Sequence, residues 1–302
     1  MSKAVSIYSI ILSIAFILSP VTLSAGNHKH RLEPTLVELW TVDESLIRPE
    51  SVVYDEYRDV LYVSNINGGT TDKDGNGYIT RISVDGDILD AEWISGLNAP
   101  KGMTISNGKL YVADIDSLLE ISLETQQVLN VYPAEGAQFL NDVAADRYGN
   151  VYVSDSRQQT VYRLHYGLLD VWVDDERISE PNGLFARAGR LIIAAGDSTA
   201  ERPGRSRYLQ SINFKNKKIK PVTDTTPLGS LDGIEKTGMG GYFLTDFREG
   251  NIIYFTRKQG AKVLATPEPG TADIDYVKDQ QVLYVPILNT GKLIAYKVLW
   301  CK

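Results

Sequence analysis

Short stretches in which apolar and polar residues alternate recur along the whole chain, and turn residues separate them. Such alternation is typical of β-strands. Six times, an apolar segment whose second residue is polar is followed by a turn and by a strand of the type Leu/Val-Tyr-Val-Ser/Ala-Asn/Asp. The six first segments open at Pro49, Pro100, Leu140, Pro181, Leu231 and Ala272, and the second strands start at Leu61, Leu110, Val151, Leu191, Tyr242 and Val282. Third strands are predicted at 78–82, 118–122, 160–164, 208–214, 251–255 and 292–298. The pattern predicts an all-β protein.

The spacing of the six repeats predicts their arrangement. The second residues of the first segments are Glu50, Lys101, Asn141, Asn182, Asp232 and Asp273, which are 51, 40, 41, 50 and 41 positions apart. A period of about 40–50 residues with several short strands is typical of a β-propeller blade. We therefore expect a six-bladed β-propeller. Leu36 to Val42 reads as an additional strand that completes the last blade and closes the ring, which leaves no open sheet edge.

The two longer spacings contain insertions at residues 65–77 and 196–207. Both insertions fall between the second and third strands of their blades, so we expect them as loops on one rim. Long loops on a rigid scaffold are where function usually resides.

Composition excludes several classes of protein. The 302 residues are 43% hydrophobic and 23% charged, with a net charge of -7 and one cysteine, Cys301. This excludes a disordered, collagen-like or disulfide-scaffold protein. Apart from the short cluster Lys215, Lys217, Lys218 and Lys220, the chain has no basic run, so no nucleic-acid partner is predicted. Cys301 is either a passive terminal residue or a link between two chains.

The N-terminus has the order of a secretory signal peptide. Lys3 precedes an apolar stretch from Val5 to Leu18, and the small pair Ser24-Ala25 follows. The apolar core is shorter than the roughly 20 residues of a membrane span, which favours cleavage over anchoring. We expect residues 1–25 to be a signal peptide and residues 26–302 a single propeller domain. The mature protein is expected in the periplasm or outside the cell, without membrane attachment.

The six polar residues that open the inner strands are expected to face one another around the propeller axis. Carboxylates and carboxamides without sulfur or imidazole favour a hard cation, with calcium first and magnesium or manganese next. Without a cation, Glu50, Asp232 and Asp273 would concentrate negative charge in a channel of low dielectric constant. The other interpretation is that these residues only form hydrogen bonds in turns.

The motifs Pro49-Glu50, Asn141-Asp142, Pro181-Asn182-Gly183 and Leu231-Asp232-Gly233, one per blade, resemble the senescence-marker-protein, gluconolactonase and luciferin-regenerating-enzyme-like family of six-bladed propellers. The resemblance covers about residues 38–299. It implies a divalent cation, commonly calcium but also zinc, magnesium or manganese, held by Glu50, Asn182 and Asp232. Asn141 would help to hold metal or substrate.

The resemblance also implies hydrolysis of lactones or esters. The cation would polarise the carbonyl group, with Asp232 as base or nucleophile and Lys101 holding an anionic group of the substrate. A mechanism with a histidine pair, as in paraoxonases, is not expected, because the only histidines are His28, His30 and His165. One alternative stays open: a non-catalytic propeller that binds a peptide, glycan or small molecule with a structural cation. The full set of oxygen donors argues against a third possibility, a metal-free condensing enzyme similar to strictosidine synthase.

The segment Asp72-Lys73-Asp74-Gly75-Asn76 copies the first half of a calcium-binding EF-hand loop. Ser83 stands where the bidentate Glu of that loop is required, and strands are expected on both sides. We therefore interpret the segment as a hairpin loop, with a weak second calcium site as the alternative.

Overall fold

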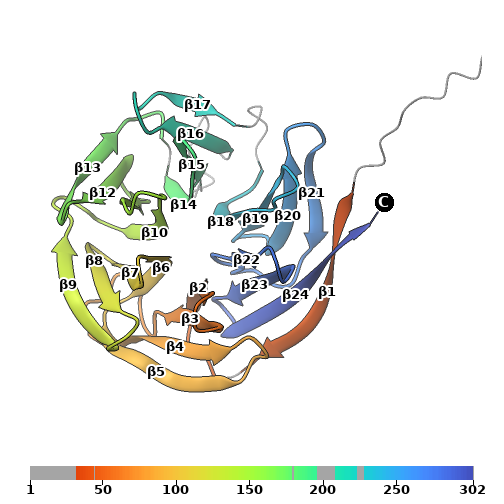
Figure 1. Cartoon of the computed structure of the whole chain (residues 1–302), viewed down its shortest axis with the longest axis horizontal. Coiled ribbons are helices and arrows are strands. Elements are labelled where there is room, and N and C mark those ends of the chain that lie inside the picture. Colours follow the sequence, from red (N-terminus) through yellow and green to blue (C-terminus); the bar gives the residue numbers. More distant parts are fainter. Residues whose placement is uncertain (1–31, 44, 179, 196–207, 223–227, 302) are drawn as a thin grey trace, which may run out of the picture.

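The computed structural model describes residues 32–43, 45–178, 180–195, 208–222 and 228–301. Six four-stranded antiparallel sheets are arranged around a central axis, with the first strand of each sheet innermost (Figure 1). The predicted six-bladed propeller is confirmed. Within the described residues there is no helix of the length and apolarity that a membrane span requires.

The blades follow one another in sequence. Blade 1 contains β2 (Pro49–Asp55), β3 (Val60–Asn65), β4 (Gly77–Ser83) and β5 (Ile88–Leu97). Blade 2 contains β6 (Pro100–Ser106), β7 (Lys109–Asp114), β8 (Ser117–Ser122) and β9 (Gln127–Pro133). Blade 3 contains β10 (Leu140–Ala145), β11 (Val151–Asp155), β12 (Thr160–His165) and β13 (Leu168–Asp174).

Blade 4 contains β14 (Pro181–Arg187), β15 (Arg190–Ala195), β16 (Leu209–Asn213) and β17 (Ile219–Pro221). Blade 5 contains β18 (Leu231–Lys236), β19 (Tyr242–Asp246), β20 (Asn251–Thr256) and β21 (Gly260–Ala265). Blade 6 contains β22 (Asp275–Val277), β23 (Val282–Ile287), β24 (Lys292–Cys301) and β1 (Glu33–Val42).

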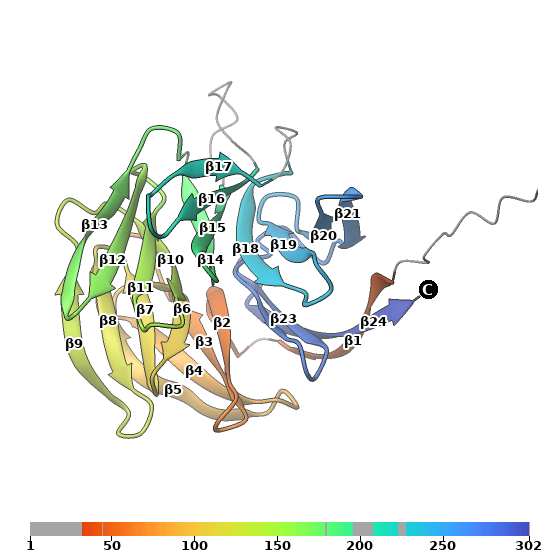
Figure 2. The same ribbon diagram turned by 45° about the horizontal axis from the view of Figure 1, so that its top comes forward.

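The N-terminal strand closes the ring, as predicted. β1 pairs antiparallel with β24, from Glu33 opposite Cys301 to Val42 opposite Leu293. The two strands lie side by side at the outer edge of blade 6 (Figure 2). Because its outermost strand comes from the other end of the chain, blade 6 cannot be completed until both ends are in place.

The hydrophobic core lies between neighbouring blades. Five of the six second strands carry a tyrosine or phenylalanine that is buried there, with Ile192 at the same position in blade 4, and the aliphatic residues on either side are buried as well. Tyr62 packs against Trp93, and Tyr152 against Trp172 and Phe214, with ring centroids 4.5–5.1 Å apart. The repeated Leu/Val-Tyr-Val pattern in the sequence therefore corresponds to the side chains that pack between neighbouring blades.

A repeated cap fixes the loops that lead into the inner strands. The last residue of a second strand accepts hydrogen bonds from backbone N–H groups just before the first strand of its own blade. Asp114 accepts from Asn98 and Ala99, and Asp155 accepts from Gln138 and Phe139, at 2.7–3.1 Å. These residues act as turn caps, and they hold the rim of the channel in place.

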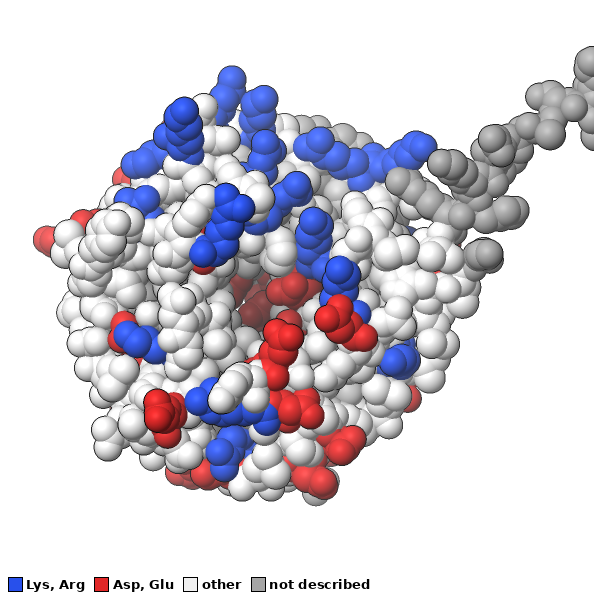
Figure 3. Space-filling view, in the orientation of Figure 1, with Lys and Arg blue, Asp and Glu red and all other residues white. Residues whose placement is uncertain are grey.

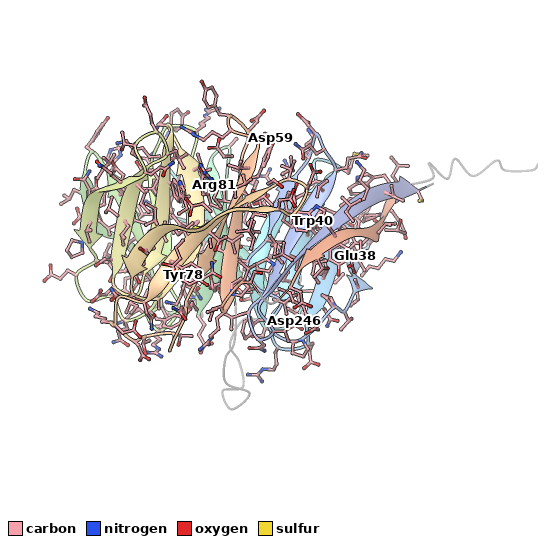
Figure 4. The ribbon with its side chains drawn as sticks, turned by 90° about the horizontal axis from the view of Figure 1, so that it is seen from below. Glu38, Trp40, Asp59, Tyr78, Arg81 and Asp246 are labelled. Carbon is pink, nitrogen blue, oxygen red and sulfur yellow. The ribbon has the colours of Figure 1, made fainter. Side chains whose placement is uncertain are left out.

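The two faces of the ring differ. We call the face on which the inner strands begin the entry face, and the other the opposite face. Tyr78, near the start of β4, and Asp246, at the end of β19, lie toward the entry face, whereas Asp59 in the β2–β3 turn lies at the opposite edge (Figure 4). Each inner strand thus presents its first residues to one face and its last residues to the other.

Candidate functional site

A cavity of about 310 Å³ opens where the inner strands begin, and we call it the entry cavity. Five of the six predicted residues line it. Its lining consists of Glu50, Ile66, Thr70, Lys101, Phe139, Asn141, Ser156, Arg157, Glu180, Asn182, Ser230, Asp232, Phe247 and Leu288. The cavity therefore combines converging polar groups from five blades with an apolar wall, which is typical of a small-molecule site.

Two oxygen atoms in this cavity are buried without a hydrogen-bond partner, Glu50 Oε2 and Asn182 Oδ1. The side-chain amide of Asn182 also interacts with the carboxyl group of Asp232, which is 5% exposed. Buried oxygens without partners are costly, and carboxylate and carboxamide oxygens are the ligands that calcium prefers. The three residues therefore fit a hard divalent cation.

The charged groups of the cavity also favour a bound cation. Burial raises the pKa of Glu50 well above its usual value, and the charges of Asp232 and Asp273 raise it further. Burial and the Asp273 charge likewise raise the pKa of Asp232. Carboxyl groups in this state favour a proton or a cation over bare ionisation. Among the described residues no three acidic, histidine or cysteine side chains converge as a metal cluster, so a cation here would need the carboxamides as well.

Lys101 is almost completely buried, with an exposed fraction of 1%. Its Nζ donates a hydrogen bond to the Ala99 carbonyl at 2.9 Å and lies 4.5 Å from the centroid of the Phe139 ring. Burial lowers the pKa of Lys101 to about 8, although the Glu50 charge opposes this. Lys101 thus brings a positive charge to the cavity wall near Glu50.

Arg157 is a site residue that the sequence analysis missed. Its guanidinium carbon lies 4.9 Å from the centroid of the Phe139 ring, so Phe139 contacts two cations. Arg157 follows β11, immediately after the Asp155-Ser156 cap. The signal available in the sequence was its position two residues after Asp155, the acidic residue that ends the second strand of blade 3.

Asn141 is held in place by a turn of its own blade, which is bonded in turn to the next blade. Its Nδ2 donates to Ser156 Oγ at 3.0 Å, and Ser156 in turn donates to the Pro181 carbonyl at 2.8 Å. This chain links blade 3 to the start of β14, where Asn182 stands. Asn141 therefore lies at the cavity wall, and its side-chain nitrogen is hydrogen-bonded to the protein rather than to a ligand.

Asp273 departs from the expected set. It precedes β22 and lines a second cavity of about 220 Å³ deeper in the channel, together with Asp142 and Asp275. Its Oδ2 accepts a hydrogen bond from Ser51 Oγ at 2.8 Å. The reason is that Thr271 pairs with Ile287 as Leu231 pairs with Asp246 in blade 5. Ala272 therefore takes the second position of the inner segment, and Asp273, at the third, contacts Ser51 of blade 1 instead of the entry cavity. Acidic side chains surround the central hollow in Figure 3.

The blade-one insertion contributes to the entry cavity through Ile66 and Thr70. The EF-hand-like part of this loop uses its oxygens internally. Asp72 Oδ2 accepts from the Gly69 N–H at 3.1 Å, and Asp74 accepts from the backbone and the side chain of Asn76. These contacts are those of a hairpin loop, which was the favoured interpretation.

Other predicted features lie elsewhere. His165 Nδ1 contacts Asn150 Oδ1 and its ring packs on Tyr166, at the end of β12 and outside the lining of the entry cavity. Cys301 is exposed and is not in a disulfide. The predicted signal peptide (residues 1–25), His28 and His30, and the insertion at 196–207 lie outside the described residues.

Comparisons with known proteins place the architecture. No protein-family model matches the chain, and no curated protein matches it in sequence. Among solved structures, a gluconolactonase from Xanthomonas campestris is similar, with a TM-score of 0.63 and 15% identity, covering 87% of this chain and 89% of that one. A protein described as a putative gluconolactonase has a TM-score of 0.63 and 16% identity, covering 88% and 93%.

A virginiamycin B lyase from Staphylococcus aureus is also similar, with a TM-score of 0.60 and 12% identity, covering 89% of this chain and 100% of that one. That structure is of a histidine-to-alanine variant described as catalytically inactive, with quinupristin. At these identities the likeness concerns the fold. The chain therefore has the six-bladed architecture of the gluconolactonase-like propellers that its motifs resemble.

Proposed function

We propose that this protein is a divalent-cation-dependent hydrolase of lactones or esters, acting in the periplasm or outside the cell, with the entry cavity as its active site. The observation that carries the proposal is the pair of buried oxygens without partners, Glu50 Oε2 and Asn182 Oδ1, beside the buried carboxyl group of Asp232. Solved gluconolactonases of similar fold support the same class of reaction.

Glu50, Asn182 and Asp232 would hold the cation, with Asn141 beside them and calcium as the first choice. When bound, the cation polarises the carbonyl group of the substrate and stabilises the negative charge that develops on its oxygen. Asp232 accepts the proton of the attacking water or attacks the carbonyl carbon itself. Its burial raises its pKa, and a carboxylate with a raised pKa is a better base near neutral pH.

The wall of the cavity indicates the kind of substrate. Lys101 and Arg157 present two cations beside Phe139, so the substrate is expected to carry a carboxylate or another anionic group near its reacting carbonyl. Ile66, Phe247 and Leu288 line the same cavity and exclude water from an apolar part of the substrate. A compact anionic lactone or ester fits a volume of about 310 Å³.

The described lining of the entry cavity contains no histidine. This distinguishes it from the virginiamycin B lyase, for which the loss of one histidine is described as inactivating. Proton transfer in this chain would therefore be carried out by a carboxylate. The donor set favours the lactonase or esterase reaction over that lyase reaction.

The test is hydrolysis of a panel of aldonolactones and aryl esters by the protein without residues 1–25, before and after treatment with EDTA. Calcium, zinc, magnesium or manganese is then restored. We expect turnover that chelation abolishes, that one cation restores best, and that Asp232→Asn and Glu50→Gln each lower by at least about 100-fold. Glu120→Gln, a carboxyl change on β8 outside the cavity, is the control and should retain activity.

Turnover that resists EDTA would overturn the cation-dependent hydrolase. No turnover on any member of the panel, with chelation lowering only the melting temperature, would instead indicate the alternative, a propeller that binds a ligand and uses the cation for stability. The Glu120→Gln control separates both outcomes from a general loss of folding.

A further inference from the structure

Another cavity, of about 430 Å³, lies between blades 4 and 5 on the opposite face, and we call it the basic pocket. It is lined by Arg187, Ala188, Arg190, Ile192, Val222, Lys236, Gly240, Tyr242 and Arg257. Most of these residues lie in or beside the β14–β15 and β18–β19 turns and the turn after β20, whereas Ile192 lies within β15 and Val222 follows β17. The basic pocket therefore lies at the far ends of the strands whose second residues, Asn182 and Asp232, line the entry cavity.

Four of the nine lining residues are cationic, and none is acidic. Figure 3 shows lysine and arginine side chains gathered over blades 4 and 5, whereas acidic side chains surround the central hollow. This concentration occurs in a protein with a net charge of -7. Like charges that share a concave site repel one another, and an anion bound among them removes that repulsion.

Two of the arginines are held in position by neutral partners. Arg187 Nη1 donates to the Tyr242 hydroxyl at 2.9 Å, and Arg257 Nε donates to the Val222 carbonyl at 2.9 Å. Each bond uses one donor of a guanidinium group that has five. Elsewhere in the described chain, Arg58 and Arg177 are instead paired with neighbouring aspartates. Arg187 and Arg257 are thus oriented, and their charge is not compensated by any ion pair within the described residues.

The shape and chemistry of the pocket select the ligand. Oriented guanidinium groups bind oxyanions through paired N–H donors, and several cations around one point favour a multiply charged group. Ile192 and Val222 are buried at 1% and 7% exposure and provide an apolar floor. A cavity of this size accepts a small molecule, whereas a flat basic surface would suit an extended polyanion.

We propose that the basic pocket binds the phosphate group of a small phosphate-bearing molecule, at a site separate from the entry cavity. Arg187 and Arg257 bind the phosphate oxygens, and Arg190 and Lys236 add positive charge at the rim. The shared chemistry of a soluble phosphate ester and of a phospholipid headgroup is the phosphate itself, and the pocket favours the soluble form because its cations line a cavity between two turns.

The test uses inorganic phosphate and pyrophosphate as probes, titrated by calorimetry at constant ionic strength. The Arg187→Gln/Arg257→Gln double variant should bind pyrophosphate at least about tenfold more weakly than the original protein. The control is Lys215→Gln/Lys218→Gln, which removes the same charge from the exposed β16–β17 turn and should change binding less than about twofold. Circular dichroism melting of both variants shows that they fold.

Three outcomes would overturn the proposal. The first is no heat of binding up to about 10 mM probe, which corresponds to an affinity too weak for a built site. The second is equal weakening in the control variant, which indicates general charge attraction. The third is binding to vesicles of phosphatidylglycerol but not to either soluble probe, with no binding to phosphatidylcholine, which indicates a membrane surface as the partner.

Discussion

The side-chain amide of Asn182 interacts with the carboxyl group of Asp232, while the carboxamide oxygen of Asn182 is buried and has no hydrogen-bond partner. The two residues are the second residues of adjacent inner strands, β14 and β18. Only the N–H groups of a carboxamide interact favourably with a carboxylate, so the nitrogen of Asn182 faces Asp232 and its oxygen has no hydrogen-bond partner. A buried acceptor without a hydrogen bond lowers the stability of a folded protein, unless a bound ion or another group interacts with it.

Calcium should therefore stabilise the protein through these residues. At a calcium concentration 100 times the dissociation constant, binding adds about 2.7 kcal/mol to the free energy of unfolding, or roughly 5–10 °C in melting temperature for a domain of this size. Differential scanning fluorimetry with and without calcium measures the shift. We expect Glu50→Gln and Asn182→Ala to remove it.

The matched control changes the EF-hand-like loop. Asp72→Asn/Asp74→Asn should retain the full shift, because the oxygens of both residues already accept hydrogen bonds within the loop. If the loop variant loses the shift and Glu50→Gln keeps it, the calcium site is the loop and not the entry cavity.

Lys101 should make the binding of anionic substrates dependent on pH. Burial lowers its pKa to about 8, so its positive charge is lost as the pH rises through that value. A cation bound at Glu50 would move this transition lower, because like charges repel. We expect KM for an anionic aryl ester to rise by about tenfold between pH 7 and pH 9, with a much smaller change for a neutral ester.

Lys101→Met separates this effect from a change at the reacting groups. The variant should have the high KM for the anionic ester at every pH, and kcat should change little. Lys109→Met, which removes a cation paired with Glu120 on the outer part of blade 2, serves as the control. A pH profile of KM that persists in Lys101→Met would assign the titration to another group.

The repeat predicted most of the fold and of the entry cavity because a propeller converts a fixed period in sequence into a fixed position around an axis. Glu50, Lys101, Asn141, Asn182 and Asp232 therefore meet as expected. Asp273 does not, because blade 6 has a short inner strand and its residues pair with blade 1 through Ser51. Thr271 pairs with Ile287 in blade 6 as Leu231 pairs with Asp246 in blade 5, so Ala272 takes the second position and Asp273 the third. A shift of one residue cannot be read from the alternating residues of this short segment.

Residues outside the inner strands could not be predicted in the same way. Arg157 reaches the entry cavity from a turn, where the path of the backbone decides the direction of the side chain. The basic pocket also could not be predicted from the sequence, because Arg187, Lys236 and Arg257 come from three turns of two blades. Only the packing of blade 4 against blade 5 brings them together.

The acidic groups deeper in the channel should reverse the usual dependence of stability on pH. Burial raises the pKa of Asp273 to about 7, even though hydrogen bonds from Ser51 and Asp142 lower it, and burial raises the pKa of Asp275 to about 6. In the unfolded chain both groups titrate near pH 4. Between about pH 4 and pH 7 the folded state therefore binds more protons, so stability is greatest at the acidic end and falls as the pH rises.

In EDTA, the melting temperature should fall by at least about 2–4 °C between pH 5 and pH 8. Asp273→Asn should reduce this fall, since an amide does not titrate, whereas Asp116→Asn on the entry face should leave it unchanged. A melting temperature that rises from pH 5 to pH 8 in EDTA would contradict the protonated state of these carboxyl groups.

The pairing of β1 with β24, which closes the ring, should be the least stable part of the fold, because these two strands come from opposite ends of the chain. Trp40 anchors β1 to blade 1 as well as to blade 6. Its Nε1 donates to the Val84 carbonyl at 2.9 Å, and its ring centroid lies 5.8 Å from that of Tyr284. Trp40→Ala removes both contacts and should cost about 2 kcal/mol, about half of a fully buried tryptophan, which corresponds to roughly 4–8 °C in melting temperature.

Leu39→Ala is the matched control, because Leu39 is the adjacent residue on β1 and is 51% exposed. It should lower the melting temperature by less than about 2 °C. Hydrogen exchange should show the larger loss of protection in β1 and β24 of the Trp40 variant, since strand pairing there depends on the anchor. Uniform loss across all six blades would mean that the ring unfolds as one unit and that closure is not its weakest link.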